Sequence, residues 1–397
     1  MLPGLQATMA EGLKETDVSE FDPQNAPIYA RPNDEVYDLL IVGAGFAGLA
    51  AAKQAALCGA KVLVVDAKSQ IGAHIHTTGI LVEEAYRFLS PPPELVRPMS
   101  GIRLYGPNRA FRDLEQANYR FYTTDTAKIL QWQAQEALQA GAEIRVRAPF
   151  IRGSQTGDIV DALIGSTLVR ARFVIGADGA KSAVASAFGL GLNTKFLVGV
   201  ERENRDIGTM EPDLLHVFLD RRTAPGYIAW AAVHPNGCQI GLAVTRKRAV
   251  QLEQFKAEIE GRFRMDPSQE YERRAGLIPT NGLVHPWIKN RVLLAGDAAG
   301  MVSPLTAGGI RTALQFGDAA GQKIAQYLRG DAKHPSVSLR PFLPHFGNRH
   351  ALRWLADQNP PNALLQAAVD FSPLAFGVRR LFFNRVGYRS DAQNHRP

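Results

Sequence analysis

Residues 37–66 read YDLLIVGAGFAGLAAAKQAALCGAKVLVVD, and this stretch decides the fold. Four consecutive aliphatic residues, Leu39 to Val42, predict a strand that is buried on both faces of a parallel sheet. A G-x-G-x-x-G turn follows at Gly43–Gly48, then an alanine-rich helix, and then a second aliphatic strand, Val62 to Val65, that ends at Asp66. The order of strand, glycine turn, helix, strand and acid predicts a dinucleotide-binding unit of the α/β class.

Each glycine of this turn has its own expected role. Gly43 permits the sharp turn, Gly45 lets a pyrophosphate approach the backbone, and Gly48 lets the helix pack close to the strand. The first helical residues, Phe46 and Ala47, offer free N–H groups to that pyrophosphate. We expect the carboxylate of Asp66, with Ala67 beside it, to bind the ribose hydroxyls. The alternative is a tight turn in a doubly wound domain that binds no ligand.

Composition narrows the class of protein. The 397 residues are 46% hydrophobic and carry a formal net charge of +7, which predicts a globular chain with a proper core. No apolar run reaches the roughly 18 residues of a membrane span, and no secretory signal pattern opens the chain. Cys58 and Cys238 are far apart in sequence, which excludes a Cys-x-x-Cys redox motif and fits a cytoplasmic protein. No nucleic-acid-binding motif is visible, and no metal site is predicted.

Two further strands run into glycine- and aspartate-containing turns. The strand Arg172 to Ile175 leads into Gly176-Ala177-Asp178-Gly179, where Asp178 holds helix N–H groups, binds the cofactor, or does both. The strand Arg291 to Leu294 leads into Gly296 and Asp297, whose carboxylate can accept a hydrogen bond from a ribityl or ribose hydroxyl. The remaining predicted cofactor contacts lie in the loop and helix start that follow: Pro304, Ala307, Gly308, Gly309 and Ile310. There the glycines let a helix N-terminus press against a flat ring.

Together the three motifs resemble the flavoprotein hydroxylase superfamily, whose fold is of the para-hydroxybenzoate hydroxylase type. Within it, GDAAGMVSPLTAGGI and the preceding Gly276-Leu-Ile-Pro-Thr are most similar to the geranylgeranyl reductase family. The segment Tyr227-x-x-Trp230 also resembles that family's Tyr-x-Trp-x-x-Pro motif, with altered spacing. The resemblance covers about residues 36–330 and implies bound FAD. It places the pyrophosphate at the first glycine turn, the adenosine ribose at Asp66 and the ribityl chain at Asp297.

The segment SQIGAHIHTTGIL at 69–81 departs from the family, whose reductases carry a cysteine-containing stretch there. In a flavin fold this stretch commonly lies beside the ring. His74 and His76 therefore either hydrogen-bond the loop backbone, or contact flavin or substrate, or form a covalent link to the flavin. Two histidines alone do not make a metal site. The resemblance makes His74, His76, Tyr227 and Trp230 the candidates for facing the reaction chamber. The halogenase signature Trp-x-Trp-x-Ile-Pro is absent.

The expected fold is a Rossmann-like FAD-binding domain with a central parallel sheet and a β-meander, an inserted antiparallel-sheet substrate domain, and a C-terminal helical region. The predicted boundaries are a tail at 1–35, an FAD-binding domain at 36–82, 123–190 and 276–332, a substrate domain at 83–122 and 191–275, and the helical region at 333–397. An amphipathic segment at 371–386 either packs on its own domain or touches a membrane peripherally.

The leading functional hypothesis is an FAD-dependent oxidoreductase that reduces a double bond of a hydrophobic or isoprenoid-like small molecule. The second is an NAD(P)H-dependent flavin monooxygenase acting on a small or aromatic substrate, and the third is a non-catalytic carrier on the same fold. Only one nucleotide fingerprint is visible. The electron donor is therefore expected to be either transiently bound NAD(P)H or a separate electron-donor protein.

Overall fold

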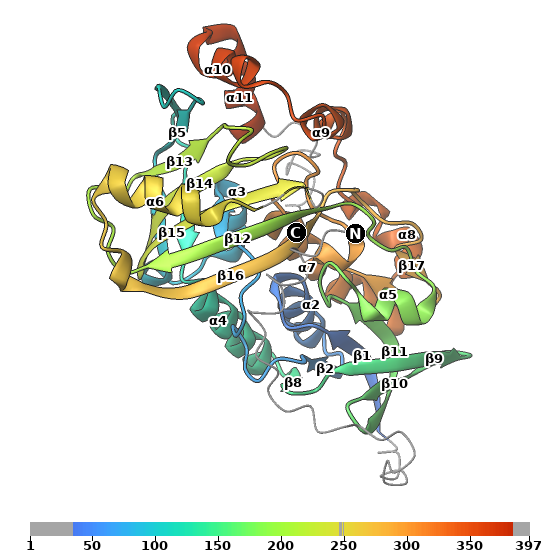
Figure 1. The fold of residues 1–397 in the computed structure, drawn as a ribbon. Helices are drawn as coiled ribbons and strands as arrows, with labels where there is room; N and C mark the ends of the chain where they lie inside the picture. Colours follow the sequence, from blue (N-terminus) through green and yellow to red (C-terminus); the bar gives the residue numbers. More distant parts are fainter. Residues whose placement is uncertain (1–34, 246–247, 249, 384–397) are drawn as a thin grey trace, which may run out of the picture.

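The computed structural model describes residues 35–383 apart from 246, 247 and 249. Figure 1 shows two large sheets with helices packed between and around them. The predicted N-terminal tail, and the part of the predicted amphipathic segment beyond residue 383, lie outside the described residues.

The first sheet is the predicted Rossmann-like sheet, and its strands follow the order β17-β18-β11-β1-β2-β8. Their bounds are Ile288–Lys289, Val292–Leu294, Thr167–Gly176, Val36–Val42, Val62–Val65 and Glu143–Arg145, in that order. The strands β18, β11, β1, β2 and β8 pair in parallel, and β17 pairs antiparallel to β18. A meander of β9 (Phe150–Thr156) and β10 (Ile159–Ile164) leads antiparallel into β11, as predicted.

Three helices pack around this sheet: α2 (Phe46–Leu57), α4 (Thr126–Gln139) and α7 (Ile310–Leu328). Helix α4 begins after Asp125, whose side chain accepts a hydrogen bond from the Lys128 backbone N–H. Helices α2 and α7 approach closely because α7 carries glycine at the contact. A Cβ at Gly317 would lie 2.3 Å from the Ala47 carbonyl oxygen, and one at Gly321 would lie 2.2 Å from that of Ala51.

The second sheet is mostly antiparallel and follows the order β16-β12-β15-β14-β13-β5-β6. The bounds are Glu270–Pro279, Phe196–Asn204, Gly237–Thr245, Ala229–His234, Leu214–Phe218, Gly101–Tyr105 and Phe111–Glu115. Helix α6 (Leu252–Phe263) covers one face through a core that includes Phe255, Ile240 and Leu242. The opposite face is turned toward the Rossmann-like sheet (Figure 1).

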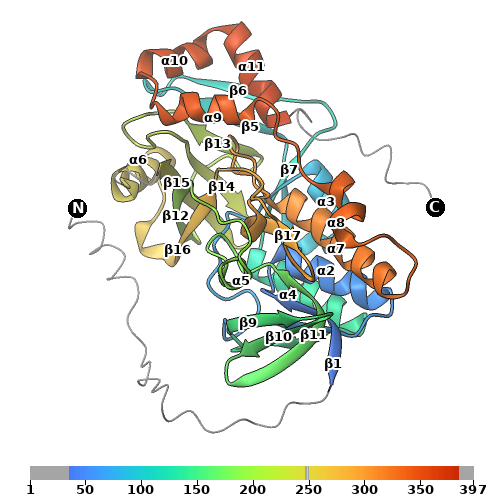
Figure 2. The ribbon, with the colours of Figure 1, turned by 90° about the vertical axis from the view of Figure 1, so that its right-hand side faces the viewer.

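The smaller elements complete the fold. A three-stranded sheet is formed by β3 (Ile80–Val82), β7 (Phe121–Thr124) and β4 (Val96–Met99). The remaining helices are α3 (Glu83–Leu89), α5 (Ala183–Phe188), α8 (Pro335–Ser338), α9 (Arg349–Asp357), α10 (Asn362–Asp370) and α11 (Ser372–Phe383). Figure 2 shows α9, α10 and α11 at the end of the molecule farthest from β9 and β10.

Candidate functional site: an FAD cradle

Three parallel strands bring the three sequence motifs to one edge of the sheet. Val42 at the end of β1 is in register with Gly176 at the end of β11, and Gly176 is in register with Leu294 at the end of β18. Carboxyl ends of neighbouring parallel strands are where ligands bind in open α/β sheets. The turns that begin at Gly43 and Gly296 therefore lie on either side of the turn that follows Gly176.

Backbone contacts confirm that the motifs meet. A Cβ at Gly43, whose φ is +105°, would lie 2.3 Å from the Ala177 carbonyl oxygen. A Cβ at Gly296 would lie 3.1 Å from the Cβ of Ala47, in the first turn of α2. These three loops, far apart in sequence, form one continuous surface.

The first glycine turn has the geometry expected of a pyrophosphate cradle. A Cβ at Gly48 would lie 1.9 Å from the Gly43 carbonyl oxygen, so this glycine lets the helix start press on the turn. At Gly45, by contrast, nothing lies within 4 Å of a Cβ. No side chain caps α2 in the described structure, which leaves the first-turn N–H groups of Phe46 and Ala47 for a ligand.

Asp66 supports the turn from behind. One carboxylate oxygen accepts the Ala44 backbone N–H and the other accepts the Lys68 backbone N–H, both at 2.8 Å. No local sequence pattern indicates this second role. Each carboxylate oxygen keeps a further lone pair that can accept a hydrogen bond from a ribose hydroxyl. Ribose binding by Asp66, with the exposed Ala67 beside it, stays a prediction.

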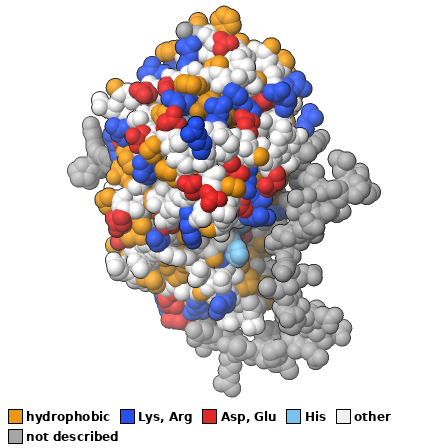
Figure 3. Space-filling model, turned by 60° about the vertical axis from the view of Figure 1, so that its left-hand side comes forward, with side chains coloured by type: hydrophobic (Ala, Val, Ile, Leu, Met, Phe, Trp, Pro, Cys, Tyr) orange, Lys and Arg blue, Asp and Glu red, His pale blue; other side chains and the backbone are white. Residues whose placement is uncertain are grey.

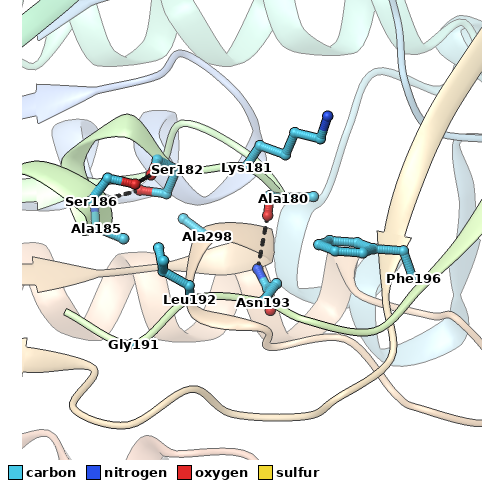
Figure 4. A pocket seen from close by; sticks show the side chains of 10 residues that line it. All are labelled: Ala180, Lys181, Ser182, Ala185, Ser186, Gly191, Leu192, Asn193, Phe196 and Ala298. Carbon is cyan, nitrogen blue, oxygen red and sulfur yellow. Dashed lines mark hydrogen bonds between the residues drawn. The ribbon is translucent and has the colours of Figure 1, made fainter. Parts of the chain in front are cut away.

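Asp178 performs the helix-capping role that was one of its two expected roles. Its carboxylate accepts the Ser182 hydroxyl at 2.6 Å and the Val184 backbone N–H at 3.0 Å, at the start of α5. Burial raises the pKa of this carboxyl, and those hydrogen bonds oppose the rise. Next to it, a pocket of about 200 Å³ is lined by Lys181, Asn193 and Phe196 among others, and Figure 4 shows Asn193 donating to the Ala180 carbonyl oxygen. Cofactor binding by Asp178 remains a prediction.

Asp297 is the acid that lacks a protein partner. Within the described residues, no donor hydrogen-bonds its carboxylate, and burial alone raises its pKa to about 6. A Cβ at Gly309 would lie 3.5 Å from its Oδ1, so the carboxylate lies beside the N-terminus of α7. A buried carboxylate without a donor is costly. A ribityl hydroxyl would supply the missing hydrogen bond.

The loop that precedes α7 is held by side chains from two other elements. Tyr227 donates its hydroxyl to the Thr306 carbonyl oxygen at 2.7 Å, and burial raises the pKa of that phenol. Arg349 of α9, which is buried, donates to the Ser303 hydroxyl at 2.8 Å. Arg349 is not among the predicted site residues, because nothing in the local pattern of α9 relates it to a loop 46 residues earlier. Within this loop Pro304 is buried, Ala307 is partly exposed and Gly308 is exposed.

Replacing Tyr227 with phenylalanine should weaken FAD binding about fivefold to tenfold, because one hydrogen bond contributes about 1 kcal/mol. A titration of apoprotein with FAD, followed by flavin fluorescence, measures this. The matched control is Tyr37→Phe, which removes a hydroxyl bonded to Glu143 at the far end of β1. We expect the control to keep the wild-type affinity, and equal losses in both variants would contradict the prediction.

The two histidines lie on the loop between the sheets. His74 is exposed and has a positive φ of 46°, and its carbonyl oxygen accepts Lys68 Nζ at 3.1 Å. His76 is also exposed, and its Nδ1 lies 2.8 Å from the Ala275 carbonyl oxygen of β16. His76 thus bonds backbone of the second sheet rather than backbone of its own loop. Catalytic roles for both stay predictions, and the described residues hold no group of three side chains that could bind a metal.

Trp230 is a core residue of the second sheet, with only 5% of its surface exposed. Its ring lies over Gly241, where a Cβ would be 2.5 Å from Cζ2, and its Nε1–H donates to Glu201 at 3.0 Å. Tyr227 and Trp230 therefore lie on different parts of the site: the tyrosine supports the cofactor loop and the tryptophan packs on the sheet. A catalytic role for either residue stays a prediction.

The residues present fit FAD. The open position at Gly45, the uncapped starts of α2 and α7, and the unpartnered Asp297 lie along one edge of the sheet. Gly45, Phe46, Ala47 and Gly48 would hold the pyrophosphate, Asp297 the ribityl chain, and Gly308, Gly309 and Ile310 the edge of the flavin ring. When bound, FAD supplies the hydride chemistry.

Sequence comparisons agree with this geometry. The family described as "FAD binding domain" matches residues 95–337, and "NAD(P)-binding Rossmann-like domain" matches residues 41–98. The chain is 31% identical over 324 residues to digeranylgeranylglycerophospholipid reductase 3 of Methanosphaera stadtmanae, which covers 75% of this chain and 79% of that protein. It is 28% identical over 310 residues to digeranylgeranylglycerophospholipid reductase of Methanocaldococcus jannaschii, with 75% and 79% covered.

Solved structures share the fold. A geranylgeranyl bacteriochlorophyll reductase-like protein from Thermoplasma acidophilum superposes with a TM-score of 0.74 at 20% identity, over 89% of this chain and 98% of that one. The p-nitrophenol 4-monooxygenase of Pseudomonas putida superposes with a TM-score of 0.67 at 15% identity, over 89% and 99%. The chain therefore belongs to the FAD-binding domain family, and it is an FAD-dependent oxidoreductase related to the geranylgeranyl reductases.

Proposed function

We propose that the protein reduces carbon–carbon double bonds of isoprenoid chains carried by a glycerophospholipid, using reduced FAD. The observation that carries the proposal is the identity of 31% to a digeranylgeranylglycerophospholipid reductase over three quarters of the chain. The chain contributes the cradle for the cofactor and a sheet that closes over it.

The surface that faces the cofactor loops suits a slender apolar chain. On the face of the second sheet opposite α6, the neighbouring strands β12, β15 and β16 present small residues, Gly199, Ala243 and Gly276. Ile228 and Ile278 pack around the same core and are only partly buried. Small side chains in the floor and branched aliphatic ones in the walls would accept the width of an isoprenoid chain without polar contacts.

The electron donor is a separate part of the proposal. We infer that NAD(P)H binds transiently or that a reduced donor protein supplies the electrons, since the chain carries a single dinucleotide fingerprint. Anaerobic reduction of the FAD-loaded protein by NADH, by NADPH and by dithionite, followed by absorbance, separates these sources.

The test of the function uses FAD-loaded protein, dithionite and a digeranylgeranylglycerophospholipid in mixed micelles under anaerobic conditions. Mass spectrometry should show products that gain two hydrogens for each double bond reduced. A product that instead gains oxygen, formed only when oxygen is admitted with NAD(P)H, would support the monooxygenase alternative. Protein that purifies without flavin and does not bind added FAD would support the carrier alternative.

A lipid substrate raises the question of membrane contact, and we propose that α9, α10 and α11 make it. Exposed large apolar side chains gather there: Trp354, Leu355, Leu364, Phe371 and Phe376, with exposed fractions of 62%, 53%, 54%, 62% and 57%. Figure 3 shows acidic and basic side chains interspersed over one face, with apolar ones at its upper end, where α10 lies. No helix among the described residues combines the length and apolarity needed to cross a bilayer.

The double substitution Phe371→Ser with Phe376→Ser should lower the vesicle-bound fraction at least tenfold, since burying each phenylalanine contributes about 1.5–3 kcal/mol. Co-sedimentation with vesicles that contain anionic lipid measures this. The matched control, Leu57→Ser with Ile151→Ser, removes two equally exposed apolar side chains from the opposite part of the molecule. Equal binding by the two double variants would sink the idea of a docking surface at α9–α11.

A further inference from the structure

Buried charged groups form a cluster on the second sheet, on the face opposite α6. Glu201 and Glu203 of β12 are 4% and 1% exposed, His234 at the end of β14 is 5% exposed, and the Arg274 side chain of β16 is 11% exposed. Glu201 is in register with Arg274 on one side and with Gly241 on the other. Ionisable groups are rarely buried in a core without a function, so the cluster needs an explanation.

The contacts within the cluster fix where its proton lies. His234 Nδ1 accepts the Asn236 backbone N–H at 3.2 Å, so the ring proton is on Nε2, which lies 2.7 Å from Glu203. Arg274 Nη1 lies 2.8 Å from Glu203 but 3.6 Å from Glu201. The guanidinium therefore favours the charge on Glu203, and Glu201 receives only the neutral Trp230 N–H at 3.0 Å.

The pKa directions follow this geometry. Burial raises the pKa of the Glu201 carboxyl well above its usual range, and the neighbouring charge of Glu203 raises it further. Burial also acts to raise the pKa of Glu203, but the interaction with the His234 ring and the charge of Arg274 bring it below the usual value. Of the two carboxyls, Glu201 is therefore the one that holds a proton more readily.

Several atoms of the cluster lack hydrogen bonds although they are buried. In the described structure these include Glu201 Oε1, Arg274 Nε and Gln239 Nε2. Gln239 is only 1% exposed, and it is in register with Glu203, so its amide lies on the same face of the sheet. Buried polar atoms are nearly always paired, so unpaired ones on one face of a sheet indicate a water, a polar ligand or a reacting group beside them.

Glu201 borders the uncovered part of this face. Gly199 lies two residues before Glu201 on β12. A Cβ at Gly199 would meet only the Ile278 side chain, at 3.4 Å, and the backbone of β16. Gly199 and its partner Gly276 remain partly exposed. The same face lies against two of the cofactor loops. A Cβ at Gly276 would lie 2.9 Å from the His76 carbonyl oxygen, and Ala307 packs against the core that contains Trp230.

We propose that Glu201 is the acid that delivers the proton when a double bond is reduced beside Gly199, an inference that rests on the proposed function. Reduction of a C=C bond requires a hydride at one carbon and a proton at the other. The O–H bond of Glu201 breaks as the π electron pair forms the new C–H bond, and Glu201 is left as a carboxylate. Arg274 and His234 stabilise the two carboxylates that then exist side by side.

The proton returns from solvent through the edge of the sheet. Tyr271 of β16, which is 38% exposed, donates its hydroxyl to Glu203 at 3.2 Å, and the partly exposed Glu272 lies 2.7 Å from Arg274. These groups, with His234 and Arg274, are the described titratable residues that contact the pair directly or, for Glu272, through Arg274. The activity of the wild type should therefore be present below the raised pKa of Glu201 and lost as the pH rises through it.

The first experiment measures the proton itself. Infrared difference spectra of the FAD-loaded protein, between about pH 5 and pH 9, should show one buried carboxylic acid band that is lost in Glu201→Gln, apart from any bands of Asp297 and Asp318, whose pKa values burial raises to about 6. The matched control is Glu253→Gln, which changes a glutamate that is 68% exposed on α6, beyond the other face of the sheet. Persistence of the band in Glu201→Gln overturns the proposal.

The second experiment measures proton delivery. Dithionite-reduced wild type, Glu201→Gln, Glu201→Asp and Glu253→Gln are mixed anaerobically with the lipid, and the oxidation of the reduced cofactor is followed. We expect Glu201→Gln to be at least about a hundredfold slower and without the alkaline loss of rate, with Glu201→Asp in between and retaining that loss. Equal rates for wild type and Glu201→Gln overturn the assignment of Glu201 alone. A wild type that reduces no double bond overturns the proposed function.

Discussion

Replacing Gly45 with alanine is expected to weaken FAD binding at least a hundredfold, about 3 kcal/mol, while the apoprotein stays within about 1 kcal/mol of wild-type stability. The position is open, since nothing lies within 4 Å of a Cβ there. Its φ of −91° suits any residue. The methyl group therefore costs the fold nothing and occupies the volume into which a pyrophosphate must come. Fluorescence titration with FAD and urea unfolding of the apoprotein measure the two quantities.

The control for this substitution is Gly48, three residues after Gly45 in the same motif. A Cβ at Gly48 would be 1.9 Å from the Gly43 carbonyl oxygen, so Gly48→Ala should destabilise the apoprotein by about 3 kcal/mol through overpacking. The two alanine variants thus separate a ligand-facing glycine from a packing glycine within one motif. Wild-type FAD affinity in Gly45→Ala would show that the turn is structural.

Replacing Asp297 with asparagine is expected to stabilise the apoprotein by about 2–3 kcal/mol at pH 8 and yet weaken FAD binding about tenfold or more. Burial raises the pKa of Asp297 to about 6, against an ordinary pKa of 3.8 in the unfolded chain. Ionisation of this acid therefore opposes folding. The amide removes that cost, but it also removes the charged acceptor that a ribityl hydroxyl would use.

The sign of the pH dependence follows from the raised pKa. Between about pH 4 and pH 6 the folded state holds a proton that the unfolded state has released, so wild-type stability falls as the pH rises through this window. Above about pH 6 this loss of stability is complete and no longer changes with pH. Asp297→Asn should lack the part of this fall that Asp297 causes and keep the part that Asp318 causes, so the two proteins converge in stability below about pH 4.

Asp318 provides the matched control. Burial raises its pKa to about 6 as well, opposed by Lys53, but it lies more than two turns along α7 from the cofactor end. Asp318→Asn should show a similar pH-dependent stabilisation of the apoprotein with unchanged FAD affinity. If both variants lose FAD equally, the carboxylate of Asp297 does not contact the cofactor.

Local sequence patterns were enough for the elements whose signals are short-range. The predicted glycine turn, the helix after it and the long helix from Ile310 to Leu328 are all confirmed. The apolar stripe of residues 124–140 predicts a helix capped by Thr124 or Asp125, and the helix begins at Thr126 with Asp125 as its cap. The pair Asn236-Gly237 predicts a hairpin turn, and it joins β14 to β15. In each case the residues that set the element lie within a few positions of it.

Strands β12 and β16 were not predicted, although they lie side by side in the second sheet. Their sequences, FLVGVEREN and EYERRAGLIP, place charges where a buried strand ordinarily has apolar residues. Pairing of Glu201 and Glu203 with Arg274 across the two strands makes the burial of these charges tolerable. Strand β16 also crosses the boundary predicted at residue 276.

The sequence by itself determined the α/β class, the three cofactor motifs and the family resemblance, because glycines and acids at strand ends act through the backbone next to them. Only the tertiary structure decided that Asp66 supports the turn, that Arg349 holds the loop before α7, and that Glu201 and Glu203 are buried together beside Arg274. These roles depend on partners that approach across sheets and helices. Burial and charge pairing are set in space, and no local spacing of residues records them.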